Sequence, residues 1–186
     1  MRMRLRQGGY WVAELFVRSA ALREATLGAL EQRGVRLAEI AELTYFLQKD
    51  YILGLTMESC LQNVEHVLAK REVQNAILTG IELDLLAERR QLSEPLQSML
   101  RADESLYGVD EVLALSILNI YGSIGYTNYG YIDKLKHGCL AALNDKSSGR
   151  VHCFLDDLVG AVAAAAASRL AHRYRSELES DLIDEE

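Results

Sequence analysis

The sequence has little of what a sheet protein or a disulfide-bonded protein requires. Only one of its 186 residues is proline, Pro95, so a fold with many tight turns between strands is not expected. Its three cysteines are odd in number and form no CxxC unit. We therefore predict reduced thiols in a cytoplasmic protein, with side chains that behave as small buried hydrophobic groups. The cysteines are Cys60, Cys139 and Cys153.

Long apolar runs are also missing. A membrane-spanning helix needs roughly 20 consecutive apolar residues, whereas the longest apolar stretch here, residues 159–167, is short and rich in alanine. The early arginines imitate a signal peptide, but Glu14 interrupts the apolar segment that follows them. We predict that the segment is retained as a helix over residues 10–33. It could lie on an anionic membrane surface, although packing on a core or a partner subunit is the more common outcome.

Positive charge is scarce. Lysine and arginine together number 20, against 27 aspartates and glutamates, which gives a net charge of −7. A general nucleic-acid-binding protein needs a basic surface that releases counterions, so this balance argues against a nucleic-acid partner.

The residues that are abundant favour an all-α fold. Apolar residues make up 49% of the chain, and leucine, alanine and glutamate predominate. We predict a single-domain helical bundle whose central helix is the alanine-rich C-terminal one, with an N-terminal extension over 1–33, a main domain over 34–175 and an acidic tail over 176–186. Further helices are expected at 37–50, from the N-cap Thr56 to 73, at 75–90, after Pro95, and at 109–121, 128–143 and 153–179. Apolar residues on several helix faces also suggest a homo-oligomer.

Five carboxylates occupy positions where a helix would normally carry apolar residues. Asp110 and Glu111 begin one predicted helix, Asp133 lies within another, and Asp156 and Asp157 begin the last. Neighbouring buried carboxylates repel, by roughly 4 kcal/mol at ~4 Å and an effective dielectric of about 20. A divalent cation with a preference for oxygen ligands would relieve this repulsion, which points to a magnesium site formed by these five acids.

Such a site suits phosphoryl chemistry. Lys136 lies one turn after Asp133 and should face the same way, where it could bind a phosphate group of the substrate. The five acids would hold the metal and carry the catalysis, with either a water or an aspartate as the nucleophile. From the pattern alone, ordinary acidic N-caps and solvated helix ends remain an alternative. By helical spacing, Glu111 should point inward, while Asp110 could reach the metal or cap its helix.

Other chemistries have weaker support. The four histidines (His66, His137, His152 and His172) show no paired spacing typical of zinc, and only His137 and His152 neighbour the acidic segments. The tyrosine-rich run at 121–131 is most simply core packing, although one hydroxyl could line the cavity.

The acidic segments YGVDEVLALSI, YIDKLKHG and FLDDLVGAVAAA resemble the phosphatidylglycerophosphatase A family. That family has a DE pair heading a helix, a D-x-x-K-P element and a DD pair opening a helix of small residues. The matching residues are Asp110 and Glu111, Asp133 and Lys136, and Asp156 and Asp157, with His137 in place of the proline. The stretches KREVQNAILTGIELDLLAE and NIYGSIGYTNYGYIDK resemble a soluble, all-helical subgroup of the family.

This resemblance implies magnesium-dependent removal of the terminal phosphate of phosphatidylglycerophosphate, which gives phosphatidylglycerol in phospholipid biosynthesis. It implies a phospholipid or other phosphomonoester as partner, with possible peripheral contact at the inner face of the membrane. Two alternatives stay open. One is an all-α nucleotide pyrophosphohydrolase, for which Glu39 and Glu42 supply half of the E-x-x-E and E-x-x-D pattern. The other is a non-catalytic helical interaction protein that keeps the fold.

Overall fold

The computed structural model describes residues 4–5, 11–12 and 19–184. It is an all-α bundle, as predicted, with two paired strands of two residues each near the N-terminus, β1 (Arg4–Leu5) and β2 (Trp11–Val12). The helices are α1 (Ser19–Gln32), α2 (Leu37–Gln48), α3 (Met57–Leu68), α4 (Arg71–Glu88), α5 (Leu96–Ala102), α6 (Val109–Leu118), α7 (Gly122–Leu135), α8 (Cys139–Leu143) and α9 (Leu155–Asp184), with a 3-10 turn, η1, at Lys146–Ser148.

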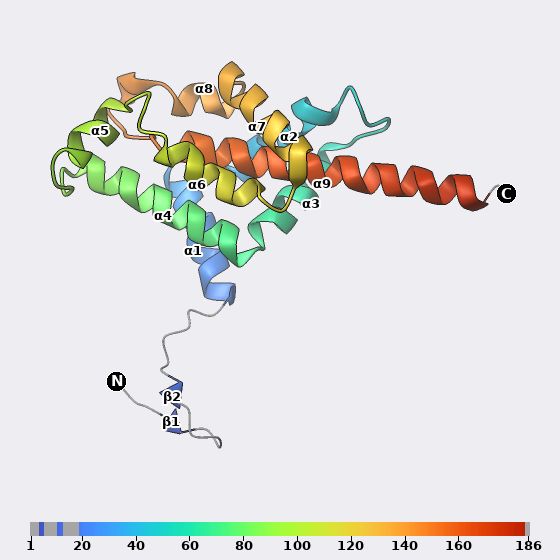
Figure 1. Ribbon diagram of the computed structural model, residues 1–186, viewed down its shortest axis with the longest axis horizontal. Helices are drawn as coiled ribbons and strands as arrows, with labels where there is room; N and C mark the ends of the chain where they lie inside the picture. Colours follow the sequence, from blue (N-terminus) through green and yellow to red (C-terminus); the bar gives the residue numbers. More distant parts are fainter. Residues whose placement is uncertain (1–3, 6–10, 13–18, 185–186) are drawn as a thin grey trace.

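Helix α9 is the central helix of the bundle, which confirms the prediction. It packs against α2, α3, α6 and α7, and it runs through the middle of the molecule in Figure 1. Residues 161–167 are almost completely buried. Because their side chains are methyl groups apart from that of Val162, the surrounding helices can approach α9 from every side. None of the described helices combines the length and apolar character that crossing a membrane requires.

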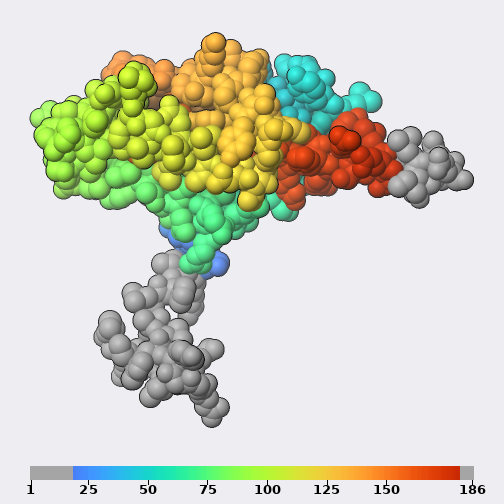
Figure 2. All heavy atoms as spheres, viewed as in Figure 1, coloured from blue at the N-terminus to red at the C-terminus, as the bar shows by residue number. Residues whose placement is uncertain are grey.

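The second half of α9 leaves the bundle. Figures 1 and 2 show it projecting beyond the other helices. The sequence there is polar, with exposed ion pairs of i,i+4 spacing between Arg173 and Glu177 and between Arg175 and Glu179. Such exposed pairs support helix formation by only a few tenths of a kcal/mol each.

Helices α4 and α9 make an unusually close contact at Gly80. A Cβ atom built on Gly80 would lie 2.5 Å from Leu158 Cδ1 and 2.9 Å from Phe154 Cβ. These separations are shorter than van der Waals contact, so only glycine fits here without movement of α9. The first turns of α9 are therefore held directly against α4.

The N-terminal prediction was partly wrong. Trp11 and Val12 pair with Leu5 and Arg4 as antiparallel strands, and α1 begins only at Ser19. The predicted helix over 10–33 therefore does not include residues 11–12, where backbone pairing replaces the helical pattern. Residue 10 and residues 13–18 of that prediction, with the apolar side chains at 15 and 16, lie outside the described residues.

The remaining helix predictions need smaller corrections. Thr56 is the N-cap of α3, as predicted, and its hydroxyl accepts a hydrogen bond of 3.2 Å from the Ser59 amide. The helix from Thr56 ends at Leu68, however, and α4 begins at Arg71. The single helix predicted over 128–143 is instead α7 and α8, because Lys136 adopts a left-handed backbone conformation with φ of 47°.

Candidate metal and phosphate site

The acids of α6 lie at its first turn. Asp110 is buried and only 7% exposed, and its Oδ1 accepts a hydrogen bond of 3.0 Å from the Glu111 amide. Glu111 is exposed at the rim. One carboxylate oxygen of Glu111 nevertheless lies within 4.8 Å of oxygens of Asp110 and Asp157, so the side chain points toward these acids, as predicted, without being buried.

The acid of α7 is joined to α9 by Lys136. Lys136, whose backbone is in the left-handed conformation, is the C-cap of α7, and its ammonium donates a hydrogen bond of 2.6 Å to Asp133. It also donates a hydrogen bond of 2.8 Å to Asp156 and lies 3.9 Å from a carboxylate oxygen of Asp157. One cation thus joins three of the predicted acids from two helices.

The five predicted acids form one acidic cluster. Oxygen atoms of Asp110, Glu111 and Asp157 all lie within 4.8 Å of one another, while Asp133 and Asp156 are joined to Asp157 through Lys136. Asp156 and Asp157 are buried although they carry carboxylates. The ligand atoms of Asp110, Glu111 and Asp157 are all oxygen, the donor type that hard divalent cations prefer, so these three residues fit a bound divalent cation.

Burial and mutual repulsion keep protons in this cluster. The hydrogen bond with Asp110, together with burial, raises the pKa of Glu111 to about 7. Burial and the charge of Asp156 raise the pKa of Asp157 to about 9, and Lys136 opposes this change. Burial disfavours the charge of Lys136, but the charge of Asp156 and the hydrogen bonds with Asp133 and Asp156 raise its pKa overall. Without a further cation, some of the five carboxyl groups therefore stay protonated, and the cluster carries fewer than five negative charges.

Sequence reasoning missed Asp84 on α4. Its side chain is 0% exposed, and its carboxylate accepts hydrogen bonds of 3.1 Å from the amides of Phe154 and Leu155, where α9 begins. It therefore satisfies amides that precede Asp156 and Asp157 in the chain. A signal was available, because Asp84 continues the apolar stripe formed by Ile77, Gly80 and Ile81 at spacings of three and four residues.

Tyr129 on α7 was also left among the core tyrosines. It is buried, its ring lies beside Gly160 of α9, and its hydroxyl has no partner in good hydrogen-bonding geometry among the described residues. Burial raises the pKa of Tyr129, and the nearby charges of Asp157 and Asp133 raise it further. The phenol therefore stays protonated, and its O–H group lies beside the carboxylate of Asp157 in the acidic cluster.

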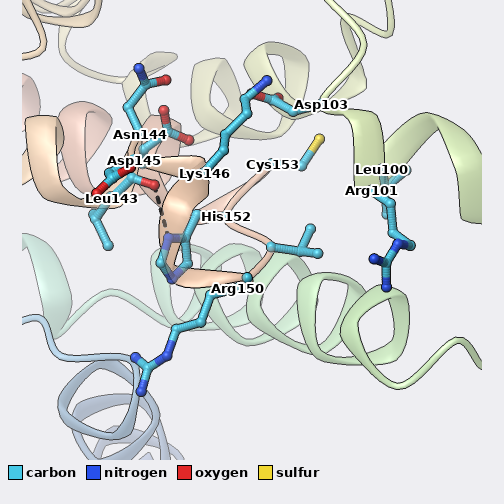
Figure 3. Close-up of a pocket in the computed structure, with 13 residues that line it drawn as sticks. Leu100, Arg101, Asp103, Leu143, Asn144, Asp145, Lys146, Arg150, His152 and Cys153 are labelled. Carbon is cyan, nitrogen blue, oxygen red and sulfur yellow. Dashed lines mark hydrogen bonds and ion pairs between the residues drawn. The ribbon is translucent and has the colours of Figure 1, made fainter.

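A small polar pocket adjoins the acidic cluster. It has a volume of about 130 Å³, and Asp156 and Cys153 lie among its lining residues. Figure 3 shows Lys146, Arg150 and His152 around it. The Cys153 thiol donates a hydrogen bond of 3.6 Å to Asp110, and burial with the charge of Asp110 raises the pKa of Cys153. Cys153 is therefore a thiol and not a thiolate nucleophile.

The loop that leads into α9 is anchored by a partly buried ion pair. Arg33 at the end of α1 lies 2.7 Å from Glu88 of α4 and donates a hydrogen bond of 2.6 Å to the Val151 carbonyl. The Val151 amide in turn donates to Glu88 at 2.8 Å. Arg33 and Glu88 therefore hold the backbone of this loop at Val151, a few residues before Asp156 and Asp157.

The other motifs considered have local contacts. His137 stacks on Phe46 with ring centroids 4.0 Å apart, and His152 Nδ1 lies 2.8 Å from the Leu143 carbonyl. Glu39, half of the pyrophosphohydrolase pattern, forms a capping box with Arg36 at the start of α2. These residues are occupied by stacking, loop and helix-end contacts.

The helical bundle and the ordered acidic motifs define the class of protein. Residues 24–172 match the phosphatidylglycerophosphatase A family, and the chain belongs to that family.

Several proteins are similar to this chain over most of its length. YutG of Bacillus subtilis, an uncharacterised protein, is 70% identical over 146 residues, which are 78% of this chain and 88% of YutG. YpjQ of the same organism, also uncharacterised, is 50% identical over 163 residues, which are 88% of this chain and 89% of YpjQ. The low temperature requirement C protein of Listeria monocytogenes has a crystal structure that aligns with this one at a TM-score of 0.82 and 61% sequence identity. The alignment covers 85% of this chain and 99% of the Listeria chain.

Proposed function

We propose that this protein is a Mg²⁺-dependent phosphatase that hydrolyses a phosphomonoester, with phosphatidylglycerophosphate converted to phosphatidylglycerol as its reaction. The observation that supports this most directly is the meeting of carboxylates from three helices. Lys136 joins the carboxylates of α7 and α9, and Asp157 of α9 lies beside the two acids of α6. Membership of the phosphatidylglycerophosphatase A family supports the phosphatase class.

The residues would divide the work by their positions. Asp110, Glu111, Asp133, Asp156 and Asp157 would hold the ion, which when bound would neutralise charge on the phosphate oxygens. Lys136 would turn from the carboxylates to the phosphate of the substrate. Glu111, at the rim of the cluster, would take a proton from the water that attacks phosphorus, and that proton would pass to the alcohol oxygen released as the ester P–O bond breaks.

The adjoining pocket supports recognition of a head group. Its volume of about 130 Å³ and its polar lining suit a small phosphorylated alcohol and leave acyl chains outside. We further propose that the protein is cytoplasmic and binds peripherally to the inner face of the membrane. We also propose that it forms a homo-oligomer. Three unpaired cysteines are consistent with a reducing compartment.

The test is release of inorganic phosphate from phosphatidylglycerophosphate in detergent by the purified full chain with magnesium. We expect Asp156→Asn to abolish release and Asp50→Asn, which changes an exposed aspartate outside the cluster, to leave it intact. If no substrate in a broad phosphomonoester panel is hydrolysed with any of several divalent metals, the proposal is wrong. Release of pyrophosphate from nucleotides would instead favour the pyrophosphohydrolase alternative.

Calorimetry of magnesium binding distinguishes the proposed enzyme from a non-catalytic helical interaction protein. An enzyme of this kind should bind the ion, and Glu111→Gln should weaken that binding. A helical interaction protein without turnover should bind magnesium weakly or not at all in both forms.

A further inference from the structure

A second pocket is lined by residues of α3 and α9 and by the residues that precede α4 and α7. It has a volume of about 420 Å³, within the range typical of small-ligand sites. Five of its lining side chains are basic and none is a carboxylate, although the whole chain has a net charge of −7. We call it the basic pocket; its residues are His66, Lys70, Tyr121, Arg169, His172 and Arg173.

The buried phenol of Tyr121 lies within the basic pocket and has an unused donor. Tyr121 is 8% exposed, and its hydroxyl has no hydrogen-bond partner among the described residues. The ammonium of Lys70 lies 5.0 Å from the centre of the Tyr121 ring. Burial raises the pKa of Tyr121, and the positive charge of Arg169 opposes this increase because Arg169 is near the phenol. A neutral O–H donor and two cations thus converge.

The cations of the basic pocket are available for a ligand. Within the part of the chain that the structure describes, neither Lys70 nor Arg169 forms an ion pair with a carboxylate. Arg173 contacts Glu177 at 3.5 Å, in an exposed pair that is easily exchanged. Lys70 is also the N-cap of α4, an 18-residue helix whose N-terminus no side chain of the N-cap closes. The positive end of that helix adds to the attraction for an anion.

The basic pocket is separate from the acidic cluster. Arg169 follows Asp156 by 13 residues on the continuous helix α9, which corresponds to a distance of about 20 Å along the axis. One phosphate group cannot contact both.

We propose that the basic pocket binds a phosphate-bearing anion, held by Lys70 and Arg169 and by a hydrogen bond from the Tyr121 hydroxyl. Both a soluble phosphate compound and the head group of an anionic lipid present this chemistry. The site does not depend on the proposed phosphatase activity, because it uses none of the residues of the acidic cluster.

The experiment uses the full chain with EDTA at low ionic strength, so that no divalent metal contributes. One arm titrates inorganic phosphate by calorimetry, and the other measures co-flotation with vesicles of phosphatidylglycerol and phosphatidylcholine against vesicles of phosphatidylcholine alone. We expect the double variant Lys70→Gln/Arg169→Gln to bind at least tenfold more weakly, and Tyr121→Phe several-fold more weakly. Arg175→Gln is the matched control, because Arg175 carries the same charge on α9 outside the pocket.

The outcomes divide clearly. Loss of phosphate binding in the pocket variants identifies a soluble anion, whereas loss of vesicle binding alone identifies a lipid head group, and either supports the proposal. Retention of binding by Asp156→Asn supports a site separate from the acidic cluster. The proposal is overturned if the wild-type chain binds neither probe, or if Arg175→Gln weakens binding as much as the pocket variants do. Tyr121→Phe, a conservative change, keeps the test valid should the double variant fold poorly.

Discussion

The ammonium of Lys136 lies 2.8 Å from the carboxylate of Asp156, which is 20 residues further along the chain. Lys136 lies among the same acids that would hold a metal ion, and it balances part of their charge. In the absence of a metal, this lysine is the principal cation of the acidic cluster.

Replacing Lys136 should therefore separate stability from metal binding. We predict that Lys136→Gln lowers the free energy of unfolding in EDTA by about 1–3 kcal/mol, because buried carboxylates lose a charged hydrogen-bond partner. Magnesium binding should not weaken, since a competing cation is gone, while phosphatase activity should fall. Urea unfolding and calorimetry check this.

The control for Lys136 is Lys134→Gln, which removes an exposed lysine from the same helix. Equal destabilisation by the two substitutions would mean that the contacts with Asp133 and Asp156 contribute nothing. A large loss of magnesium affinity in Lys136→Gln would show that the lysine organises the metal ligands instead of competing with the ion.

Tyr129→Phe tests the role of the phenol beside the acidic cluster. The substitution keeps the ring against α9 and removes only a hydroxyl that has no partner in good hydrogen-bonding geometry among the described residues. We predict about a tenfold to 100-fold loss of kcat with little change in the melting temperature, as expected if the hydroxyl donates to the reacting phosphate. Tyr131→Phe, at an exposed position of the same helix, should have normal activity. A normal kcat in Tyr129→Phe would assign Tyr129 to packing alone.

The close contact of α4 and α9 predicts a strong effect of one methyl group. Gly80→Ala should lower the free energy of unfolding by about 1–3 kcal/mol, because the new Cβ overlaps Leu158 and Phe154. Gly28→Ala is the matched control: a Cβ there meets nothing within 4 Å, so the better helix former should be neutral or stabilising. Denaturant unfolding of both variants measures these changes. An unchanged free energy of unfolding in Gly80→Ala would mean that α4 and α9 can move apart at little cost.

The stability of the metal-free protein should fall as the pH rises. Burial raises the pKa of Asp84 to about 8 and that of Asp157 to about 9, whereas aspartates of an unfolded chain titrate near pH ~4. Between these values the folded state binds more protons than the unfolded state. Folding is therefore favoured at low pH, and this contribution is lost as the pH passes from about 4 to about 9.

Magnesium should counteract this trend. An ion that binds only the folded state stabilises it by about 2.7 kcal/mol at 100 times its dissociation constant, and deprotonated carboxylates bind it best. We expect the melting temperature in EDTA to decrease from pH 5 to pH 9, and the increase caused by magnesium to be larger at pH 9. An increase that is equal at both pH values would argue against these carboxylates as ligands.

The all-α class, the central α9 and the Thr56 cap could be predicted because each depends on local pattern. The acidic residues of the cluster could also be named, since carboxylates stand out in apolar helices. The importance of Asp84 was not predicted, because its partners, the amides of Phe154 and Leu155, lie some 70 residues away. The spacing of Asp84 along α4 marks it as a buried position, but its hydrogen bonds depend on tertiary packing, which no local pattern contains.

The break after α7 illustrates the same limit. A lysine rarely adopts a left-handed backbone, and the sequence shows only Gly138 as a nearby helix breaker. In the folded protein Lys136 gains hydrogen bonds with Asp133 and Asp156, which offset the local strain. The sequence pattern placed Lys136 and Asp133 on one face, but it could not place Asp156 beside them.

Helix α9 supplies both the centre of the hydrophobic interior and two members of the acidic cluster. Its first turn therefore cannot fray without disturbing the packing of the whole bundle. Heat inactivation should accordingly coincide with global melting, and no compact, partly active species should accumulate during a thermal ramp.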